Sequence, residues 1–404
     1  TPTLEVSVEL NNGIIGVSSV PSGASCGKTE ALELRDNDPN YLFSKSVLKA
    51  IENVEKIIAP ELVGKNASHQ ALIDEIILKT DGSESFSNLG ANAALGVSMA
   101  VCTAASKSYN LELFQYLGGI HSSVLPIPLI NVLNGGAHSD NPLDFQEFMI
   151  VPIGAKSFRE AMKISLEVFY QLKILFKKKG LSTSVGDEGG FSPNLKTPKE
   201  VLELLVEAIE NAKYSTNTVK LALDVAAGEF YKDGNYVLKG EERILSSCEM
   251  IGYLTDLREE FPIISIEDGL APEDFDYWKT LTTNLAKKCL LVGDDLFTTN
   301  PKLLSRGISN KVANSILIKP NQIGTISKAI SAFDIAKRAC YKTIVSHRSG
   351  ETESTFIADF AVGLNAGFIK TGSLTRSERT AKYNRLLYIE ELLGKNAKYG
   401  GNYI

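Results

Sequence analysis

The chain has 404 residues, with 42 Lys and Arg against 48 Asp and Glu, so its formal net charge is −6. A hydrophobic content of 44% with 22% charged residues is typical of a folded protein and excludes a disordered or fibrous one. The acidic balance argues against nucleic acid as the main partner, because phosphate binding needs clustered basic residues. No apolar run approaches the roughly 20 residues of a membrane span.

The cysteine pattern favours a reducing compartment. The five cysteines are scattered without a CxxC pair, and the first residues do not resemble a signal peptide. We therefore expect a cytoplasmic protein, and leave open a cell-surface or secreted fraction exported without a signal peptide. The chain begins at Thr1-Pro2, already inside a strand-like pattern, so we expect a further N-terminal segment to precede it.

The first part of the chain predicts a small α+β domain. Apolar and polar residues alternate over 4–10, a turn signal follows at 11–13, and a second strand pattern covers 14–20. This arrangement predicts a β-hairpin. Apolar residues at helical spacing over 47–58, and the Ala-rich stretch 91–105, predict helices packed beside it.

Beyond residue 120, short runs rich in Ile, Val and Leu alternate with helical stretches, which is typical of a (β/α)₈ barrel. Two helices, with capping-box starts at Ser157-x-x-Glu160 and Thr197-x-x-Glu200, come before the third run. We predict an α/β protein: an α+β capping domain over 1–120, then a (β/α)₈ barrel with an irregular ββαα start over 121–404. The eight runs are Pro128–Leu133, Phe148–Val151, Lys220–Asp224, Ile263–Glu267, Cys289–Asp294, Ser315–Lys319, Thr343–His347 and Gly367–Lys370.

Polar side chains end each of the last six runs. In a barrel the carboxyl ends of the strands meet at one face, where the active site is built. A strand that simply meets a polar loop explains any one of these residues, but explains six in succession poorly. We therefore predict that they share one site; they are Asp224, Glu267, Asp294, Lys319, His347 and Lys370.

The order of these residues indicates a chemistry. Asp224, Glu267 and Asp294 supply three carboxylates, and an oxygen-only ligand set suits Mg²⁺ rather than Zn²⁺. The next run supplies Lys319, whose pKa beside a divalent cation should be lowered, so that it can act as a base. A metal and a lysine base together predict proton abstraction next to a substrate carboxylate, with the metal stabilising the enolate.

Two Gly-rich stretches could supply a general acid. Val185–Gly190 carries Glu188, and Asn134–His138 is followed by Gln146 and Glu147. Such an Asp-Glu pair in a glycine loop is ordinarily a solvated turn. Together with Lys319, however, Glu188 becomes a candidate acid, and a base with an acid describes an elimination of water.

Residues 22–29 nearly spell a phosphate-binding GxxxxGK[ST] loop. Ser22 stands where the motif has Gly, Pro21 comes just before it, and the helical signal after Thr29 is weak. We therefore interpret this segment as a flexible lid, whose serine hydroxyl is available to a metal or a phosphate, rather than as a nucleotide site.

With these residues in this order, the sequence resembles the enolase (phosphopyruvate hydratase) family over essentially its whole length. Ten stretches in order, across both predicted domains, carry the resemblance, and Ser265–Gly269 is similar to bacterial members. The stretches are Pro21–Ser25, Asn134–His138, Gln146–Met149, Gly186–Gly190, Ala222–Ala227, Ser265–Asp268, Gly293–Leu296, Asn321–Gly324, Ser346–Glu353 and Ile369–Gly372.

The resemblance implies reversible dehydration of 2-phospho-D-glycerate to phosphoenolpyruvate. Lys319 would take the C2 proton and Glu188 would protonate the departing hydroxyl, with Glu147, His138 and His347 as further catalytic residues lining the pocket. The expected substrate-binding residues are Gln146 and Lys319, together with Arg348 and Ser349 for the phosphate and Lys370 for the carboxylate. Two Mg²⁺ ions are implied, the first held by Asp224, Glu267 and Asp294, and the second meeting Ser25 together with the substrate.

The resemblance also implies a homodimer or higher homo-oligomer, with no nucleic acid and no membrane span. The family's usual N-terminal strand is absent from this sequence, which puts a complete subunit interface in doubt. One alternative is a catalytically retired relative that serves as a structural or surface-binding protein, but every catalytic position holds the required residue type. Another is a racemase or cycloisomerase of the same superfamily, but the early strand runs lack the Lys-x-Lys base typical of those enzymes.

Overall fold

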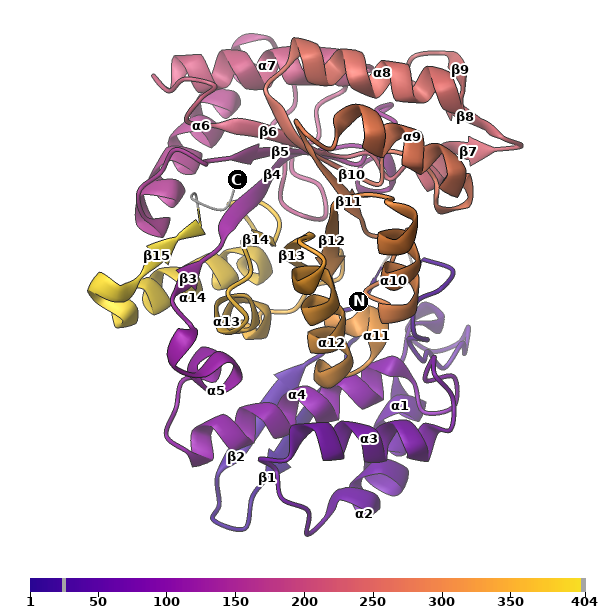
Figure 1. The fold of residues 1–404 in the computed structure, drawn as a ribbon, viewed down its shortest axis with the longest axis vertical. Helices are drawn as coiled ribbons and strands as arrows, with labels where there is room; N and C mark the ends of the chain where they lie inside the picture. Colours follow the sequence, from indigo (N-terminus) through magenta and orange to yellow (C-terminus); the bar gives the residue numbers. More distant parts are fainter. Residues whose placement is uncertain (24–26, 401–404) are drawn as a thin grey trace.

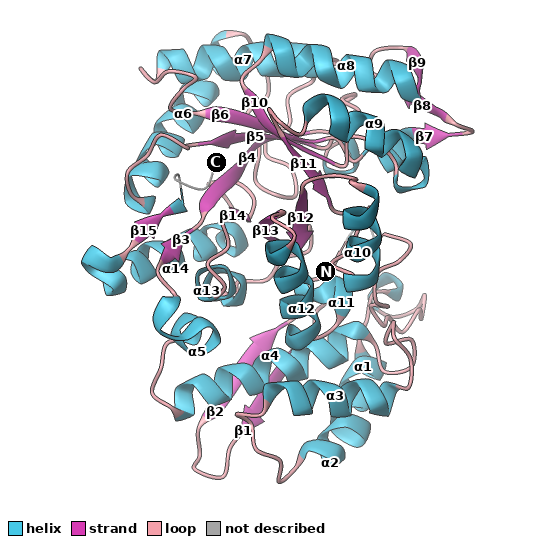
Figure 2. Ribbon diagram, viewed as in Figure 1, coloured by secondary structure: helices cyan, strands magenta, loops and turns pink. Residues whose placement is uncertain are grey.

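The computed structural model describes residues 1–23 and 27–400, so Ser25, predicted to meet the second metal, lies outside the described residues. Figure 1 shows a small N-terminal part, in indigo and purple, packed beneath a larger barrel. In Figure 2 the barrel strands form the centre of the upper part, and helices surround them. The predicted fold class, a small N-terminal domain followed by a β/α barrel, is confirmed. The boundary between residues 120 and 121 stays a prediction.

The N-terminal part is built on the predicted hairpin. Its strands pair antiparallel, and one long, almost fully buried helix, α4, lies against them. The backbones touch where β2 crosses α4: a Cβ on Gly16 would lie 2.3 Å from the carbonyl oxygen of Ala100, so only glycine fits there. The elements are β1 (Glu5–Glu9), β2 (Ile15–Ser19), α1 (Leu48–Asn53), α2 (Ala59–Leu62), α3 (Gln70–Asp81), α4 (Ala91–Ser108) and α5 (Leu113–Gly118).

Eight strands, one from each predicted run, close into a barrel. Going round the wall, the order is β10, β11, β12, β13, β14, β4, β5 and β6. Every neighbouring pair is parallel except the two pairs that contain β5, which runs the opposite way. The bounds are β4 (Ile127–Asn134), β5 (Glu147–Val151), β6 (Lys220–Asp224), β10 (Ile263–Glu267), β11 (Leu290–Gly293), β12 (Ser315–Ile318), β13 (Lys342–Ser346) and β14 (Phe368–Lys370).

Helices cover the outside of the barrel, and two short sheets flank it. Two helices, α6 and α7, separate β5 from β6, which confirms the irregular ββαα start. The helices are α6 (Phe158–Lys178), α7 (Pro198–Asn211), α8 (Ser247–Glu260), α9 (Phe275–Leu285), α10 (Pro301–Asn310), α11 (Pro320–Ile323), α12 (Ile326–Arg338), α13 (Phe356–Gly363) and α14 (Ser377–Leu393). The short sheets are β3 (Val124–Leu125) with β15 (Lys398–Tyr399), and β7 (Tyr231–Lys232), β8 (Asn235–Leu238) and β9 (Arg243–Ser246).

The predicted helix starts differ in one detail. Thr197 and Glu200 form a complete capping box at the start of α7. At α6 the Ser157 hydroxyl accepts from the Glu160 N–H, but the Glu160 carboxylate accepts from the backbone N–H of Lys156 instead of closing the box. Both helices still begin where the sequence predicts, because the N-cap oxygen satisfies one of the unpaired N–H groups of the first turn.

An apolar layer inside the barrel fixes which side chains reach its mouth. Successive strand residues point to opposite faces, so the residue two places beyond an inward apolar side chain also points inward. Four strands bring an ionisable group to the mouth in this way, and on the reversed β5 the same step runs from Met149 back to Glu147. The four pairs are Ala222 and Asp224, Val292 and Asp294, Leu317 and Lys319, and Phe368 and Lys370.

The helices also bear on whether the chain could span a membrane. None of the helices within 1–23 and 27–400 combines the length and the apolar character needed to cross a bilayer.

No α-helix follows Thr29 until α1 begins at Leu48, so the described part of the 22–29 segment lacks the helix that a phosphate-binding loop requires.

Candidate active site

One cavity at the mouth of the barrel collects the predicted residues. It encloses about 510 Å³, part of which is open to solvent. Glu267 lies beside this cavity rather than in its wall, and reaches it through its contact with Lys370. The predicted residues in the wall are His138, Gln146, Glu147, Glu188, Asp224, Asp294, Lys319, His347, Arg348, Ser349 and Lys370.

Lys370 is the electrostatic centre of one wall. Its Nζ lies 2.7 Å from Asp224 Oδ2, 2.8 Å from Glu267 Oε2 and 3.2 Å from Glu147 Oε1, and its side chain is 2% exposed. Burial opposes the charge on this ammonium, but the three carboxylates outweigh burial and raise the pKa of Lys370 well above its ordinary value. Lys370 is therefore a fixed cation, whose charge is shared among three acids.

Those acids also repel one another. Burial and the neighbouring Asp224 raise the pKa of Glu267 well above its ordinary value, even though Lys370 opposes the shift. Asp224 and Glu267 are register partners on β6 and β10, so the sheet holds their side chains as neighbours. Gln146 Nε2 donates to Asp224 Oδ2 over 3.3 Å. More positive charge is needed here than Lys370 supplies.

Lys319 stands directly after β12 and pairs with Asp294, which follows β11. Thr299 Oγ1 accepts from the Lys319 backbone N–H over 2.9 Å, and Gln322 Nε2 donates to Asp294 Oδ1 over 2.8 Å. Burial opposes the charge on Lys319, but Asp294 outweighs it and the pKa of Lys319 is raised. The nearest neighbour of the ammonium is a carboxylate, and the lowered pKa expected beside a divalent cation stays a prediction.

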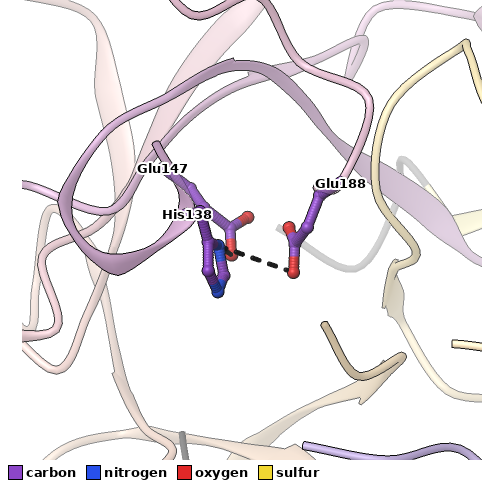
Figure 3. Close-up of side chains that lie close together, drawn as sticks. All are labelled: His138, Glu147 and Glu188. Carbon is purple, nitrogen blue, oxygen red and sulfur yellow. Dashed lines mark ion pairs between the residues drawn. The ribbon is translucent and has the colours of Figure 1, made fainter. Parts of the chain in front are cut away.

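A second group of ionisable side chains comes from the β4 and β5 side of the barrel. In Figure 3, Glu188 and Glu147 converge on the ring of His138. His138 Nδ1 lies 3.8 Å from Glu147 Oε1 and 3.7 Å from Glu188 Oε1, and all three residues are buried. Asn131 Nδ2 also donates to Glu188 Oε2 over 3.0 Å.

The two carboxyl groups of this cluster differ in their affinity for a proton. Burial and the nearby Glu188 raise the pKa of Glu147 well above its ordinary value. Burial also disfavours charge on Glu188, but His347 and His138 outweigh it and hold the pKa of Glu188 well below its ordinary value. When the surroundings push the pKa values of two neighbouring carboxyl groups apart in this way, the pair can hold one proton between them.

His347 and Arg348 follow β13 and face different partners. His347 Nε2 lies 3.5 Å from Glu188 Oε1. Arg348 Nη1 lies 2.7 Å from Glu30 Oε2 and 3.3 Å from Asn321 Oδ1. A buried guanidinium beside the cavity is suited to bind an anion, because its planar donors match carboxylate and phosphate oxygens.

Several residues at the site carried no separate signal in the sequence. Glu30 and Gln322 hold Arg348 and Asp294, yet they lie outside the strand ends that drew attention to the site. Arg379, on α14, contacts both His347 and the backbone beyond it. Asp268, Asp294 and Asp295 form a further acidic group whose oxygen atoms lie within 4.8 Å of one another. Of that last group Asp294 was a predicted metal ligand, whereas Asp268 and Asp295 lie in stretches that carry the resemblance but had no role assigned to them.

Both parts of the chain match known families. Residues 1–117 match the enolase N-terminal domain, and residues 122–404 match the enolase C-terminal TIM barrel domain. The chain belongs to the enolase family. The resemblance found in the sequence is thereby confirmed, and so is the predicted activity class: the protein is a phosphopyruvate hydratase, a lyase of glycolysis.

Family membership implies a metal, and the arrangement of acids fits one. The carboxylates gathered at the mouth offer oxygen donors only, and burial with mutual repulsion raises the pKa of Glu267 despite the adjacent ammonium. A divalent cation among these acids would relieve that repulsion. Oxygen donors of this kind are the ones preferred by Mg²⁺ and Ca²⁺.

Proposed function

We propose that the chain catalyses the reversible, Mg²⁺-dependent conversion of 2-phospho-D-glycerate to phosphoenolpyruvate, with Lys319 as the base and Glu188 as the acid. The observation that carries this proposal is the placement of the two groups on the barrel. Lys319 follows β12, and Glu147, the partner of Glu188, begins β5, which stands four places away in the ring of eight strands. Strands four places apart form opposite walls of the barrel, so the base and the acid lie against opposite faces of a molecule held between them.

Each step of the elimination has a group in place. In its neutral form Lys319 accepts the proton from C2, and the charge that it gains is balanced by Asp294. A divalent cation bound among the neighbouring carboxylates would favour that neutral form. On the other wall, the raised pKa of Glu147 keeps a proton on that carboxyl group, and this proton passes through Glu188 to the departing hydroxyl, which leaves as water. His138 Nδ1 lies within 4 Å of both carboxyl groups. The balance is one proton and one hydroxide removed, and one carbon–carbon double bond formed.

Asp224, Glu267 and Asp294 would hold the first Mg²⁺, and Ser25 would meet the second together with the substrate. When bound, the metal supplies positive charge that stabilises the negative charge developing on the substrate carboxylate. Lys370, already among these acids, would bind that carboxylate. Gln146 would orient the substrate from the same wall through its bond to Asp224.

Arg348 and Ser349 would bind the phosphate group, at the end of the cavity next to Lys319. Arg348 is supported in this role by its burial, its place in the cavity wall and its planar donors. A phosphate there competes with Glu30, which lies against the same guanidinium. His347 would contribute through Glu188, its neighbour at 3.5 Å.

We further propose a homodimer or higher homo-oligomer in the cytoplasm, in line with family membership. The enzymatic proposal is tested by following phosphoenolpyruvate formation from 2-phosphoglycerate with Mg²⁺ and with excess EDTA. We expect formation that EDTA stops and added Mg²⁺ restores. Formation of phosphoenolpyruvate at an unchanged rate in EDTA, or none with Mg²⁺, would overturn the proposal.

A further inference from the structure

Arg379 is a buried arginine that joins two segments of the active site. It lies in the first turn of α14, and its side chain is only 1% exposed. Its Nη1 atom contacts His347 Nδ1 and lies 2.6 Å from the Arg348 carbonyl oxygen. Its Nη2 atom lies 2.6 Å from the Ser349 carbonyl oxygen and 3.4 Å from that of Asp187. The four Nη hydrogens thus connect the segment around 348 with the segment that carries Glu188.

The contact with His347 determines where the imidazole carries its proton. A guanidinium has donors only and keeps its charge at every relevant pH. His347 Nδ1 must therefore accept with its lone pair, which leaves the single N–H of the neutral ring on Nε2. Burial and the Arg379 charge also lower the pKa of His347 to about 3, although Glu188 opposes the shift, so the ring stays neutral near pH 7.

The Nε2–H group faces the candidate acid. Nε2 lies 3.5 Å from Glu188 Oε1, too far or too poorly aligned for a formed hydrogen bond, and within the described ranges it has no hydrogen-bond partner. In the other tautomer a lone pair would face the carboxylate, which burial makes costly. One orientation of the ring and one tautomer therefore suit Arg379 and Glu188 together.

The fold makes room for this arginine. Gly372 follows β14 with φ +80°, and a Cβ there would lie 2.6 Å from Arg379 Cδ and 3.0 Å from Cγ. A side chain at 372 would push the arginine away from its carbonyl partners. The close approach of backbone and arginine stem keeps the guanidinium plane in place against four acceptors.

We propose that Arg379 is a positioning residue for the dehydration, which fixes His347 as the neutral Nε2–H tautomer directed at Glu188 and ties the Glu188 segment to the phosphate-binding segment. The inference rests on the proposed role of Glu188 as the acid. A lysine could not replace Arg379, because one ammonium cannot donate hydrogen bonds to four acceptors arranged around a planar guanidinium.

The tautomer is measured directly by long-range ¹H–¹⁵N correlation spectra of the ¹⁵N-histidine-labelled protein at pH 7, with His347→Gln to assign the signal. We expect a protonated Nε2 and an unprotonated Nδ1 in the full-length, otherwise unchanged chain. An Nδ1–H tautomer or an imidazolium would overturn the proposal. This measurement does not depend on activity, so it stands even if the proposed reaction is wrong.

A kinetic test separates positioning from folding. Arg385, on the same helix, is the control for Arg379 because its partly buried guanidinium pairs with Asp359 and Glu112, away from the cavity. We expect Arg379→Gln to lower kcat for phosphoenolpyruvate formation by about 10-fold or more, with a smaller effect on C2 proton exchange and with mixed His347 tautomers. Arg385→Gln should change stability without this split. Equal loss of exchange and dehydration in Arg379→Gln, or the same split in Arg385→Gln, would contradict the proposal.

Discussion

Glu147 on β5 is the register partner of Asp224 on β6. Because β5 runs antiparallel to its neighbours, the start of this strand lies at the same rim as the ends of the others. Glu147 therefore enters the site from the opposite chain direction. The reversed strand joins the carboxylates proposed to bind metal on one side to the acid cluster on the other, with Lys370 in contact with both.

Removing the Lys370 ammonium should leave three buried carboxylates without their shared cation. We expect Lys370→Met to lower the free energy of unfolding by about 3–5 kcal/mol, because a broken buried pair leaves uncompensated charge. Urea unfolding in EDTA measures this, and Mg²⁺ should restore part of the loss. Lys302→Met is the matched control, since Lys302 pairs with Glu84 on the exposed surface and should cost less than about 1 kcal/mol. Equal stabilities of the two variants would contradict this account of Lys370.

The buried His347 should make stability depend on pH. Its pKa is lowered from 6.5 to about 3 by burial and by Arg379, so below pH 6.5 the unfolded chain binds this proton more readily than the folded one. The stabilisation is complete above pH 6.5 and is lost as the pH falls towards 3, with a slope of about 1.4 kcal/mol per pH unit. Urea unfolding between pH 4 and 6 should show a slope shallower by one proton in His347→Asn. If the slope in His347→Asn is unchanged and matches that of the exposed control His69→Asn, His347 does not cause the pH dependence of stability.

The predicted metal ligands can be tested without turnover. Asp224→Asn should weaken Mg²⁺ binding, measured by isothermal titration calorimetry, by about 10-fold or more, because a carboxylate ligand loses its charge. Asp276→Asn, on the exposed side of α9, is the control and should bind as the unchanged protein does. Identical Mg²⁺ affinities in the two variants would remove Asp224 from the metal site.

Much of this arrangement was predictable from the sequence for a simple physical reason. Strand residues alternate in direction, so apolar runs that end in ionisable residues reveal both the barrel wall and the groups at its mouth. Asp224 and Lys319 were found in this way, although they lie 95 positions apart. The hairpin was plain from its period of two, and the long helix α4 was plain from its run of small apolar residues.

What the sequence could not reveal depends on contacts between distant segments. The reversal of β5 leaves no mark in its apolar run, so nothing there placed Glu147 beside Asp224. The pairing of Lys319 with Asp294, which raises the pKa of Lys319, depends on how β11 and β12 lie side by side in the barrel. Arg379 lies in a charged helical stretch whose sequence does not mark it, and only the folded loop around Arg348 shows what its guanidinium does.

The central claim is that Lys319 and Glu188 perform separate proton transfers from opposite walls. Exchange of the C2 proton of 2-phosphoglycerate with deuterated water, followed by NMR beside phosphoenolpyruvate formation, tests it most directly. Lys319→Ala should lose exchange and dehydration together, whereas Glu188→Gln should lose dehydration and keep measurable exchange. Exchange at the unchanged rate in Lys319→Ala, or equal loss of both reactions in Glu188→Gln, would contradict the account.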